Sequence, residues 1–487
     1  MSDALIKELA GLCGAEHAFA AADPRAAIYG QLFGLEPRTP PDYVAVARPA
    51  NVESLQSVLR LAAAEELRIW STPNAAGNGA RLGEAGVSGL VVDLRRMNRI
   101  LEVDTRSACA LIEPGVSYRQ LHAHLAKNNI PLWIDCDRDP GHSIAGSICS
   151  RQFGFTPYAD HLQMQCGMEV VLADGEIVRT GMGALPGNNT WQLFKYNFGP
   201  YLDGLFTQSG LALVTKIGLW IMPAPPRYQP FMATLPDQAA LEQAIEVLRP
   251  LKIGGLIGNT VVIAGAELDA AESGPREDFQ SGGALDPAKL MQARGAWNLY
   301  GALYGAPENV ELSWQIVQES LRAIAGATVH TSGEREQDRA WRIRQELMRG
   351  QPPAQPLALA SWGGPDCMRL TAATPMEGQH ASRMGQIAAR VLAAHKLDNL
   401  HEFALTWRTL LMRITLPYDR GDPQSFRNAL SAAESLLKEL AGAGYGIVDE
   451  SPELRRLLDR HTGGSDLAAL VQRLQHGLSP TAQAAGG

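Results

Sequence analysis

Long hydrophobic runs are missing from this chain of 487 residues. No window approaches the roughly 18 apolar residues that a membrane-spanning helix needs, so the sequence predicts no membrane partner. Long basic runs are missing too, and 43 lysines and arginines against 51 aspartates and glutamates give a formal net charge of −8. This acidic balance disfavours a nucleic-acid partner. The first residues lack the charged-then-apolar order of a secretory signal.

Cysteine is scarce, and its spacing matches no metal site. The chain has six cysteines, and no two of them form a C-x-x-C pair: Cys13, Cys109, Cys136, Cys149, Cys166 and Cys367. Scattered thiols of this kind are typical of a reduced compartment, so the sequence predicts a cytoplasmic protein without a metal site.

The N-terminal part alternates short strands with helices. A helix is predicted near Ser2, and Asn51 is a candidate cap for a second helix with apolar residues on one face. Strands are predicted at residues 68–70, 89–94, 100–104 and 109–113, and Ser117 is the candidate cap of the helix that follows. This order predicts an α+β domain in a chain long enough for roughly two or three domains.

The stretch from Leu132 to Pro223 is rich in glycine and poor in charge. Residues 168–172 read as a buried strand, Asp174-Gly175 as the centre of a hairpin turn, and residues 177–180 as the returning strand. The loops around this hairpin would let the backbone approach a large ligand. Alternatively, the glycines only make turns.

Three segments of this stretch, in order, resemble a known family. They read Gly141-His142-Ser143-Ile144-Ala145-Gly146-Ser147, Gly154-Phe155-Thr156-Pro157-Tyr158-Ala159-Asp160-His161 and Gly167-Met168-Glu169-Val170-Val171-Leu172. The chain resembles the vanillyl-alcohol oxidase and 4-cresol dehydrogenase (p-cresol methylhydroxylase, PCMH) flavoprotein family as a divergent member. The resemblance implies a PCMH-type FAD-binding domain of two subdomains at residues 1–222. It also implies a cap domain at 223–422, with an antiparallel sheet flanked by helices, and C-terminal helices at 423–487 that return to the FAD domain.

The remainder of the chain gives coarser predictions. Helices are expected at residues 239–251, 314–325, 423–440 and 467–476, and strands at 297–304 and 369–373. The polar, glycine-rich segment from Glu267 to Pro287 is expected to be an exposed loop. The small residues from about 479 onward are expected to be a disordered tail.

The resemblance implies which residues contact FAD. The loop at residues 71–79 would offer backbone N–H groups to the pyrophosphate. Pro73 stands where the family has glycine and donates no N–H group, and Asn78 stands where the family has an aromatic residue. Each implied contact has an alternative role in a turn or in the core. The implied contacts are Thr72, Asn74, Ala75, Ala76, Gly77, Asn78, Pro114, Gly115, Val116, Ser143, Gly146, Ser147, Thr156, Pro157, Gly167, Met168, Glu169 and Val214.

The catalytic positions of the family are altered. Its aspartate near the flavin falls on Arg138, with Asp139 beside it, and a phenolate-binding tyrosine falls on Phe155. The family's Tyr-Arg pair falls on Val448-Asp449. The alignment therefore implies a non-phenolic substrate.

The position that tethers the flavin covalently in many members falls on Leu411 or Met412, in a segment expected to form one strand at residues 403–414. Neither side chain is nucleophilic, so FAD is expected to be bound non-covalently.

The polar candidates near the flavin are Arg138, Asp139, His142, Tyr158, Trp407, Arg408 and Arg413. Arg138 or Arg408 could bind a carboxylate, and Asp139 or His142 could act as a base. Alternatively, these are solvated residues or local ion pairs.

Our first hypothesis is an FAD-dependent oxidoreductase that moves a hydride from an alcohol, an amine or a carboxylate-bearing intermediate to the flavin. The alternatives are a catalytically degenerate partner of an active flavoenzyme and an isomerase or cyclase without net oxidation. The resemblance implies a homodimer, and the electron acceptor is left open.

Overall fold

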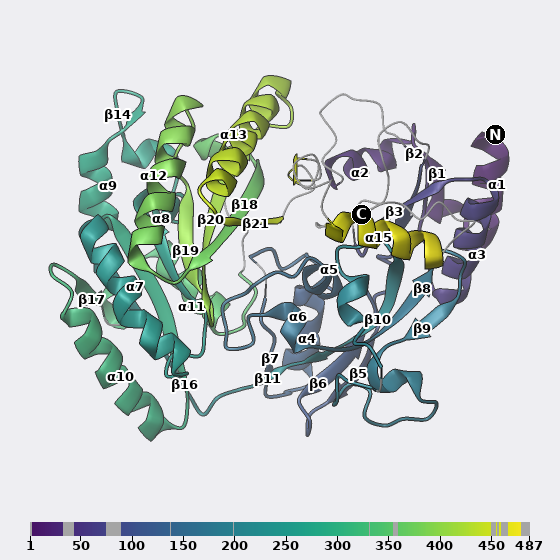
Figure 1. Cartoon of the computed structure of the whole chain (residues 1–487), viewed down its shortest axis with the longest axis horizontal. Helices are drawn as coiled ribbons and strands as arrows, with labels where there is room; N and C mark the ends of the chain where they lie inside the picture. The colour runs from purple at the N-terminus through teal and green to yellow at the C-terminus, as the bar shows by residue number, and fades with distance from the viewer. Residues whose placement is uncertain are drawn as a thin grey trace. The chain divides into compact units, whose positions relative to one another are not determined.

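The computed structural model describes residues 2–32, 43–74, 89–136, 138–197, 199–330, 332–353, 359–449, 454, 457–458 and 466–478. The chain forms two compact units, both visible in Figure 1. The first comprises Met1–Phe153, Asp160–Pro223 and Arg455–Gly487, and the second comprises Gly154–Ala159 and Ala224–Leu454.

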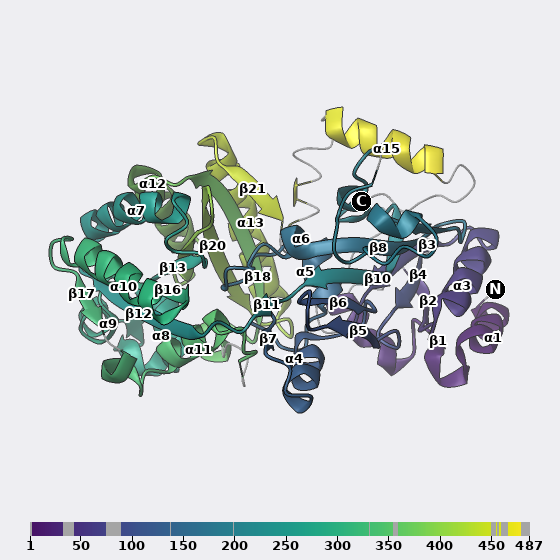
Figure 2. The same cartoon turned by 90° about the horizontal axis from the view of Figure 1, so that it is seen from below.

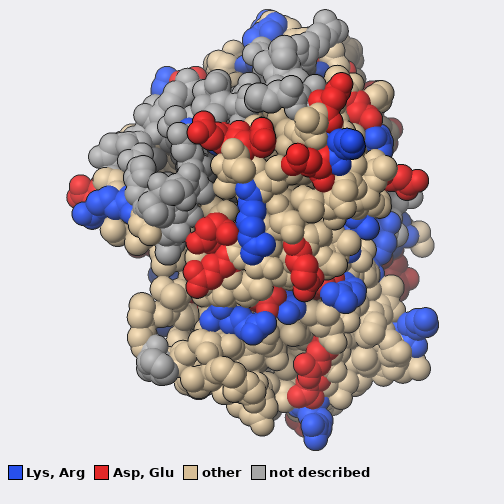
Figure 3. All heavy atoms as spheres, turned by 90° about the vertical axis from the view of Figure 1, so that its right-hand side faces the viewer, with Lys and Arg blue, Asp and Glu red and all other residues tan. Residues whose placement is uncertain are grey.

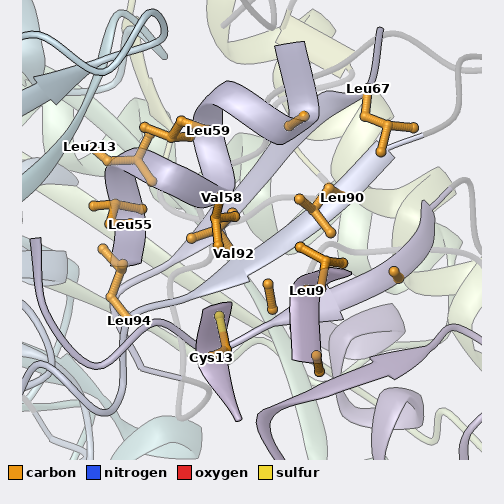
Figure 4. Packing of buried hydrophobic residues seen from close by; sticks show 14 of the residues in the cluster. Leu9, Cys13, Leu55, Val58, Leu59, Leu67, Leu90, Val92, Leu94 and Leu213 are labelled. Atoms are coloured by element: carbon orange, nitrogen blue, oxygen red, sulfur yellow. The ribbon is translucent and has the colours of Figure 1, made fainter. Parts of the chain in front are cut away.

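The first unit begins with a four-stranded sheet. Its strand order is β1 (Ala18–Ala20), β2 (Tyr43–Ala47), β4 (Gly89–Asp93) and β3 (Arg68–Thr72), and the last three run parallel. Leucine and valine side chains from α1 (Ser2–Cys13), α3 (Val52–Ala64) and β4 pack into one core, which Figure 4 shows from close by. Asn51 caps α3 as predicted, and Ser54 returns the bond to complete a capping box.

A second, antiparallel sheet completes the first unit. Its order is β5 (Ile100–Asp104), β6 (Cys109–Ile112), β10 (Ala212–Trp220), β8 (Gln165–Leu172) and β9 (Ile177–Arg179). The predicted β8–β9 hairpin is confirmed, and Gly175 turns it with φ of 90°. The other elements of this unit are α2 (Ala27–Leu32), α4 (Tyr118–Lys127), α5 (Ile144–Cys149), α6 (His161–Met164), α15 (Asp466–Leu478) and the paired strands β7 (Leu132–Trp133) and β11 (Met222–Pro223).

The second unit is built on an eight-stranded antiparallel sheet. Its strands, in spatial order, are β17 (Thr328–His330), β12 (Arg227–Leu235), β16 (Trp297–Gly305), β13 (Val261–Gly265), β19 (His401–Leu405), β20 (Thr409–Tyr418), β18 (Asp366–Pro375) and β21 (Gly446–Asp449). This sheet confirms the expected cap architecture, and together the two units give the α+β class.

Helices cover both faces of this sheet. One face packs against α7 (Gln238–Ile253), α10 (Pro307–Arg322), α12 (Gly378–Ala394) and α13 (Pro423–Gly442). The other face packs against α8 (Ala266–Ser273) and α11 (Arg339–Met348), which contact strands in the β12–β19 half of the sheet. Figure 2 shows α7 and α12 on one side of the strands and α8 and α11 on the other. The helix α9 (Pro287–Arg294) packs on α8.

The exposed loop expected from Glu267 to Pro287 was a wrong prediction. The segment contains α8 and the short hairpin of β14 (Gln280–Ser281) and β15 (Ala284–Leu285). Asp269 and Glu272 on α8 are buried, and ion pairs to Arg294 and Arg344 replace the water that their charges would otherwise need.

Two further expectations needed correction. Residues 403–414 do not form one strand, because β19 ends at Leu405 and the chain turns through Thr406, whose hydroxyl donates to the Thr409 carbonyl at 2.9 Å. The helix from Pro423 does not return to the first unit. It is α13, and its apolar face packs on β18, β20 and β21 of the second unit.

No helix in the described part of the chain is both long and apolar enough to cross a membrane. Acidic and basic side chains are interspersed over the face drawn in Figure 3 rather than separated by sign.

Candidate functional site

Ser143 joins two of the predicted ligand-binding segments in the first unit. It caps α5, and its hydroxyl accepts a bond from the Gly146 N–H group at 3.0 Å. The same hydroxyl donates to the Pro114 carbonyl at 2.5 Å, and Ile144 N donates to the Val116 carbonyl at 3.1 Å. Segments 114–116 and 143–147 are therefore held side by side. Their contact with FAD stays a prediction.

The loop at residues 72–74 contacts the segment from Gly141 to Gly146. Thr72 donates its hydroxyl to the Asn74 carbonyl at 2.6 Å, and the Asn74 amide donates to the Gly141 carbonyl at 3.0 Å. A Cβ atom on Gly146 would lie 3.0 Å from Cγ of Pro73, so the Pro73 ring packs closely on the Gly146 backbone. The expected contacts Ala75, Ala76, Gly77 and Asn78 lie outside the described residues.

Gly115 has a packing reason to be glycine. A Cβ atom there would lie 2.9 Å from the carbonyl oxygens of Leu94 and Met97. Its role is therefore to let the segment pass close to the end of β4, which places Pro114 and Val116 beside Ser143.

Among the residues of segments 72–74, 114–116 and 143–147, Ser147 is the one that indicates a ligand. Its side chain is fully buried, and its hydroxyl has no hydrogen-bond partner among the described residues. A buried hydroxyl without a partner is costly, and native proteins rarely leave one unsatisfied. A polar ligand at the junction of the three segments would supply the missing partner.

Four other predicted contacts lie in the antiparallel sheet. Met168 and Glu169 on β8 are buried, and Val214 on β10 pairs with β8. Gly167 has φ of 80°, and the indole of Trp191 occupies the space where a Cβ atom would stand. All four therefore have packing roles, and their contact with a ligand stays a prediction.

Glu169 is the centre of a buried ion-pair network. Its carboxylate lies 2.8 Å from Arg179 and 3.0 Å from Lys216, and it accepts a bond from the Thr215 hydroxyl at 3.0 Å. Burial raises the pKa of this carboxyl, but the bonds from Lys216 and Arg179 outweigh burial and lower the pKa below its usual value.

Thr156 and Pro157 belong to the second unit by their contacts. Thr156 is fully buried, and its hydroxyl accepts a bond from the Tyr158 N–H group at 3.1 Å. This bond fixes the turn at residues 156–158, and a ligand contact stays a prediction.

The predicted catalytic loop contains an acid–histidine pair. Oδ2 of Asp139 lies 3.5 Å from Nε2 of His142, while its Oδ1 accepts a bond from the Gly141 N–H group at 2.8 Å. The loop is tied to the first turn of α4, because the Tyr118 and Arg119 N–H groups donate to the carbonyls of His142 and Pro140. Asp139 is therefore placed to hold the His142 ring, and the partly buried Arg138 precedes the pair.

A second histidine cluster forms around Asp135, three residues before Arg138, and the sequence analysis assigned it no role. Nε2 of His161 lies 2.8 Å from Oδ1 of Asp135, and Nδ1 lies 3.3 Å from the Tyr118 hydroxyl. All three side chains are buried. The cluster fixes the start of the loop at Asp135. The sequence feature that could have indicated the contact between His161 and Asp135 is the place of His161 at the end of the segment from Gly154 to His161.

In the second unit, Arg408 lies in the β19–β20 turn, is exposed, and stacks 4.9 Å above the neighbouring Trp407 ring. That position is typical of a solvated residue, and a role in binding stays a prediction. Leu411 and Met412 are both buried on β20. Within the described ranges, no group of three or more His, Cys, Asp and Glu side chains could hold a metal ion.

Comparison with known proteins gives consistent similarities. A sequence profile described as "FAD binding domain" matches residues 43–181. The chain is 35% identical to the 4-cresol dehydrogenase [hydroxylating] flavoprotein subunit of Pseudomonas putida over 83% of this chain and 79% of that protein. It is 28% identical to 1'-carboxy-chondrochloren decarboxylase of Chondromyces crocatus over 89% of this chain and 87% of that protein.

A solved structure of p-cresol methylhydroxylase with bound substrate has the same fold. It superposes with a TM-score of 0.91 at 29% identity and covers 99% of this chain and 95% of that one.

The residues at the three-segment junction fit an FAD cofactor. The buried Ser147 hydroxyl lacks a protein partner in the described part of the chain, and the glycine at 146 lets the backbone come close. Ser147, Asn74 and the backbone of segments 72–74 and 114–116 would hold the group.

Proposed function

Because the chain belongs to the vanillyl-alcohol oxidase and 4-cresol dehydrogenase family of FAD-dependent oxidoreductases, we propose that it dehydrogenates a small non-phenolic substrate through the loop at residues 138–142. When bound, the flavin accepts a hydride from a substrate C–H bond. The protein has to bind the cofactor, hold the substrate carbon and receive a proton.

The observation that carries this proposal is the His142–Asp139 pair. Asp139 accepts a backbone bond with one oxygen and faces His142 with the other, so the ring is held by a carboxylate whose position the turn itself fixes. His142 is the base in this arrangement and Asp139 its orienting partner. Arg138 precedes them and binds a polar group of the substrate through its guanidinium fork.

The non-phenolic substrate follows from the residues at the family's phenolate positions. At one of these positions the family has a tyrosine and this chain has Phe155. The Phe155 ring is 3% exposed and has no hydroxyl. Without that hydroxyl the chain lacks one donor that a phenolate needs. An alcohol, an amine or a carboxylate-bearing intermediate is therefore the proposed substrate, and no observation favours a catalytically degenerate scaffold.

Three finer points are part of the same proposal. The FAD is non-covalent, which the apolar side chains of Leu411 and Met412 support. The protein is a homodimer, by its likeness to the family. The location is cytoplasmic, which the six free cysteines support. An absorption spectrum before and after acid precipitation tests the first point, because a tethered flavin would stay in the pellet.

The activity is tested by mixing the FAD-loaded protein anaerobically with a panel of alcohols, amines and hydroxy acids and following loss of the oxidised flavin spectrum. His142→Gln should slow flavin reduction by about 100-fold or more at saturating substrate, since a general base contributes that much. Asp139→Asn keeps the oxygen that accepts from Gly141 and removes the charge that faces His142, so it should slow reduction less.

His380→Gln is the matched control. His380 also stands three residues after a carboxylate, Glu377, at 3.8 Å, but on α12 of the second unit. The flavin of His380→Gln should be reduced at the same rate as that of the unmodified protein. Equal rates in His142→Gln and His380→Gln would refute the role of the pair, and no flavin reduction by any class in the panel would refute the proposed reaction.

A further inference from the structure

One imidazole in the first unit joins the two ends of the loop that carries His142. At the start of the loop, Nε2 of His161 lies 2.8 Å from Oδ1 of Asp135. At its end, the Tyr118 N–H group donates to the His142 carbonyl at 3.2 Å. Nδ1 of His161 lies 3.3 Å from the hydroxyl of the same tyrosine. We call Asp135, His161 and Tyr118 the histidine network.

The three residues of the histidine network come from separate elements of the first unit. Tyr118 begins α4, Asp135 follows β7, and His161 begins α6 directly after its cap, Asp160. The three side chains are all buried, at 1%, 4% and 6% exposure in that order. The network therefore ties both ends of the loop to the first turns of two helices.

The two ring nitrogens of His161 have different partners. An ionised carboxylate only accepts hydrogen bonds, so the proton of the neutral ring belongs on Nε2, which donates to Asp135. Nδ1 then accepts from the Tyr118 hydroxyl. Because a reversed ring would satisfy neither partner, the network holds the imidazole in one orientation and fixes the separation of Asp135 and Tyr118.

The neighbours of Tyr118 hold the end of the loop as well. Arg119 N donates to the Pro140 carbonyl at 2.9 Å, and Ser117 forms an isolated antiparallel bridge with Ser143. The first turn of α4 thus contacts the loop backbone at residues 140, 142 and 143. A displacement of Tyr118 would move this whole part of the loop, and the His142 ring with it.

The burial of three polar side chains needs a reason other than stability. Apolar residues of similar volume often stabilise a core as well or better, because polar groups lose their water on burial. A hydrogen-bonded network instead favours one arrangement over its alternatives. The arrangement matters for a base, since a misplacement of about 1 Å can slow a reaction about 100-fold.

We propose that His161 is a positioning residue for the base His142. It holds Asp135 and Tyr118 at a fixed separation, so the loop between them presents the His142–Asp139 pair in one geometry. His161 acts through the loop backbone and does not itself receive the proton. This inference rests on the proposed function and adds a residue outside the loop on which the same reaction depends.

Two substitutions separate the contacts of the ring. His161→Asn places its amide group about where Nδ1 stands and loses the bond to Asp135, whereas the amide nitrogen of His161→Gln stands about where Nε2 does and keeps that bond. Flavin reduction is measured with whichever alcohol, amine or hydroxy acid of the panel reduces the unmodified protein. His161→Asn should slow it about tenfold or more at saturating substrate, with unchanged half-saturating concentration and FAD content, and His161→Gln should restore most of the rate.

A double substitution distinguishes positioning from a general loss of structure. If His161 acts through His142, adding His161→Asn to His142→Gln should slow reduction little further. The double variant should then be about 100-fold slower than the unmodified protein, as His142→Gln alone is, whereas independent effects would multiply to about 1,000-fold.

Hydrogen exchange follows the loop without turnover. The Tyr118 and Arg119 amides donate to loop carbonyls, so they should exchange about tenfold faster in His161→Asn than in the unmodified protein, and less fast in His161→Gln. Tyr118→Phe is a milder second variant, because it removes the hydroxyl that faces Nδ1 and keeps the ring and the backbone N–H group. Exchange of both amides should rise in this variant too.

His401→Asn is the matched control. His401 is also buried, at 4% exposure, but it lies on β19 of the second unit, where its Nδ1 faces the Asn399 carbonyl. Its substitution should change the melting temperature, as expected for a buried histidine, and leave the rate of flavin reduction and the exchange of the Tyr118 and Arg119 amides unchanged.

The proposal is overturned if the two amides exchange in His161→Asn and Tyr118→Phe as they do in His401→Asn. It is equally overturned if the effects of His161→Asn and His142→Gln on the rate multiply. If no member of the panel reduces the flavin, the proposed reaction is refuted, and amide exchange still decides whether His161 holds the loop, so the two failures are distinguishable.

Discussion

Replacement of Arg344 by methionine should strongly destabilise the second unit. Arg344 is 1% exposed and donates three hydrogen bonds, at 2.9 and 2.8 Å to Glu272 and at 2.8 Å to Glu402. Methionine fills a similar volume but takes these bonds away from two carboxylates that are themselves almost fully buried. The variant therefore isolates the electrostatic loss from any cavity.

The size of the stability loss follows from the burial of the ion pairs that Arg344 makes. Removing one partner of a buried ion pair costs about 3–5 kcal/mol, because the remaining charges have neither water nor a counter-ion. At roughly 2–4 °C per kcal/mol for a unit of this size, the melting temperature should fall by about 6–20 °C. Arg390→Met, which breaks an exposed pair with Glu439, should leave it unchanged.

The assay is urea denaturation, with hydrogen exchange of the α11 and β19 amides to report on the second unit. Adding Glu272→Gln to Arg344→Met should recover part of the loss at about pH 7, since it removes one of the two buried charges. A loss below about 1 kcal/mol would refute the reasoning.

Three further predictions concern single positions. Ser147→Ala should leave the apoprotein as stable as before and weaken FAD binding roughly three- to tenfold in a cofactor titration, because the hydroxyl has no protein partner to lose among the described residues. Gly167→Ala should cost about 2–5 kcal/mol in urea denaturation, since the new Cβ meets Trp191, whereas Gly187→Ala, also at positive φ but with open space around it, should cost less. Burial lowers the pKa of His401 to about 4, so the unfolded chain takes up the proton first and up to about 3 kcal/mol of stability should be lost as the pH falls from about 6.5 to about 4. His401→Phe should flatten this part of the pH–stability curve, and an unchanged curve would contradict the assignment.

The parts of the fold that the sequence predicted well are those governed by near neighbours. Asn51 and Ser117 cap the helices that follow them, and Asp174-Gly175 turns the β8–β9 hairpin. Each of these choices depends on the conformations and hydrogen bonds of residues a few positions apart, so a local pattern carries the information. The family resemblance implied FAD contacts in segments 72–74, 114–116 and 143–147, and the structure showed that these segments contact one another.

Distant partners explain the failures. Glu267 to Pro287 reads as a polar surface loop, yet Glu272 is buried because Arg344 stands 72 residues further along the chain. The single strand expected at 403–414 is a hairpin because Thr406 binds Thr409. A charged residue looks solvent-exposed in a sequence whenever the ion that neutralises it is far away in the chain.

The sequence by itself determined the alternation of elements, the glycine-rich segments and the loop that carries Arg138, Asp139 and His142. The tertiary structure decided which polar groups face one another. Arg413 was one candidate among several in the sequence, and only the β18–β20 register placed it opposite Thr371. Register is set by pairing across the sheet, and a shift of β20 by one residue would turn Arg413 to the other face, away from Thr371, so no local pattern could have specified that pairing.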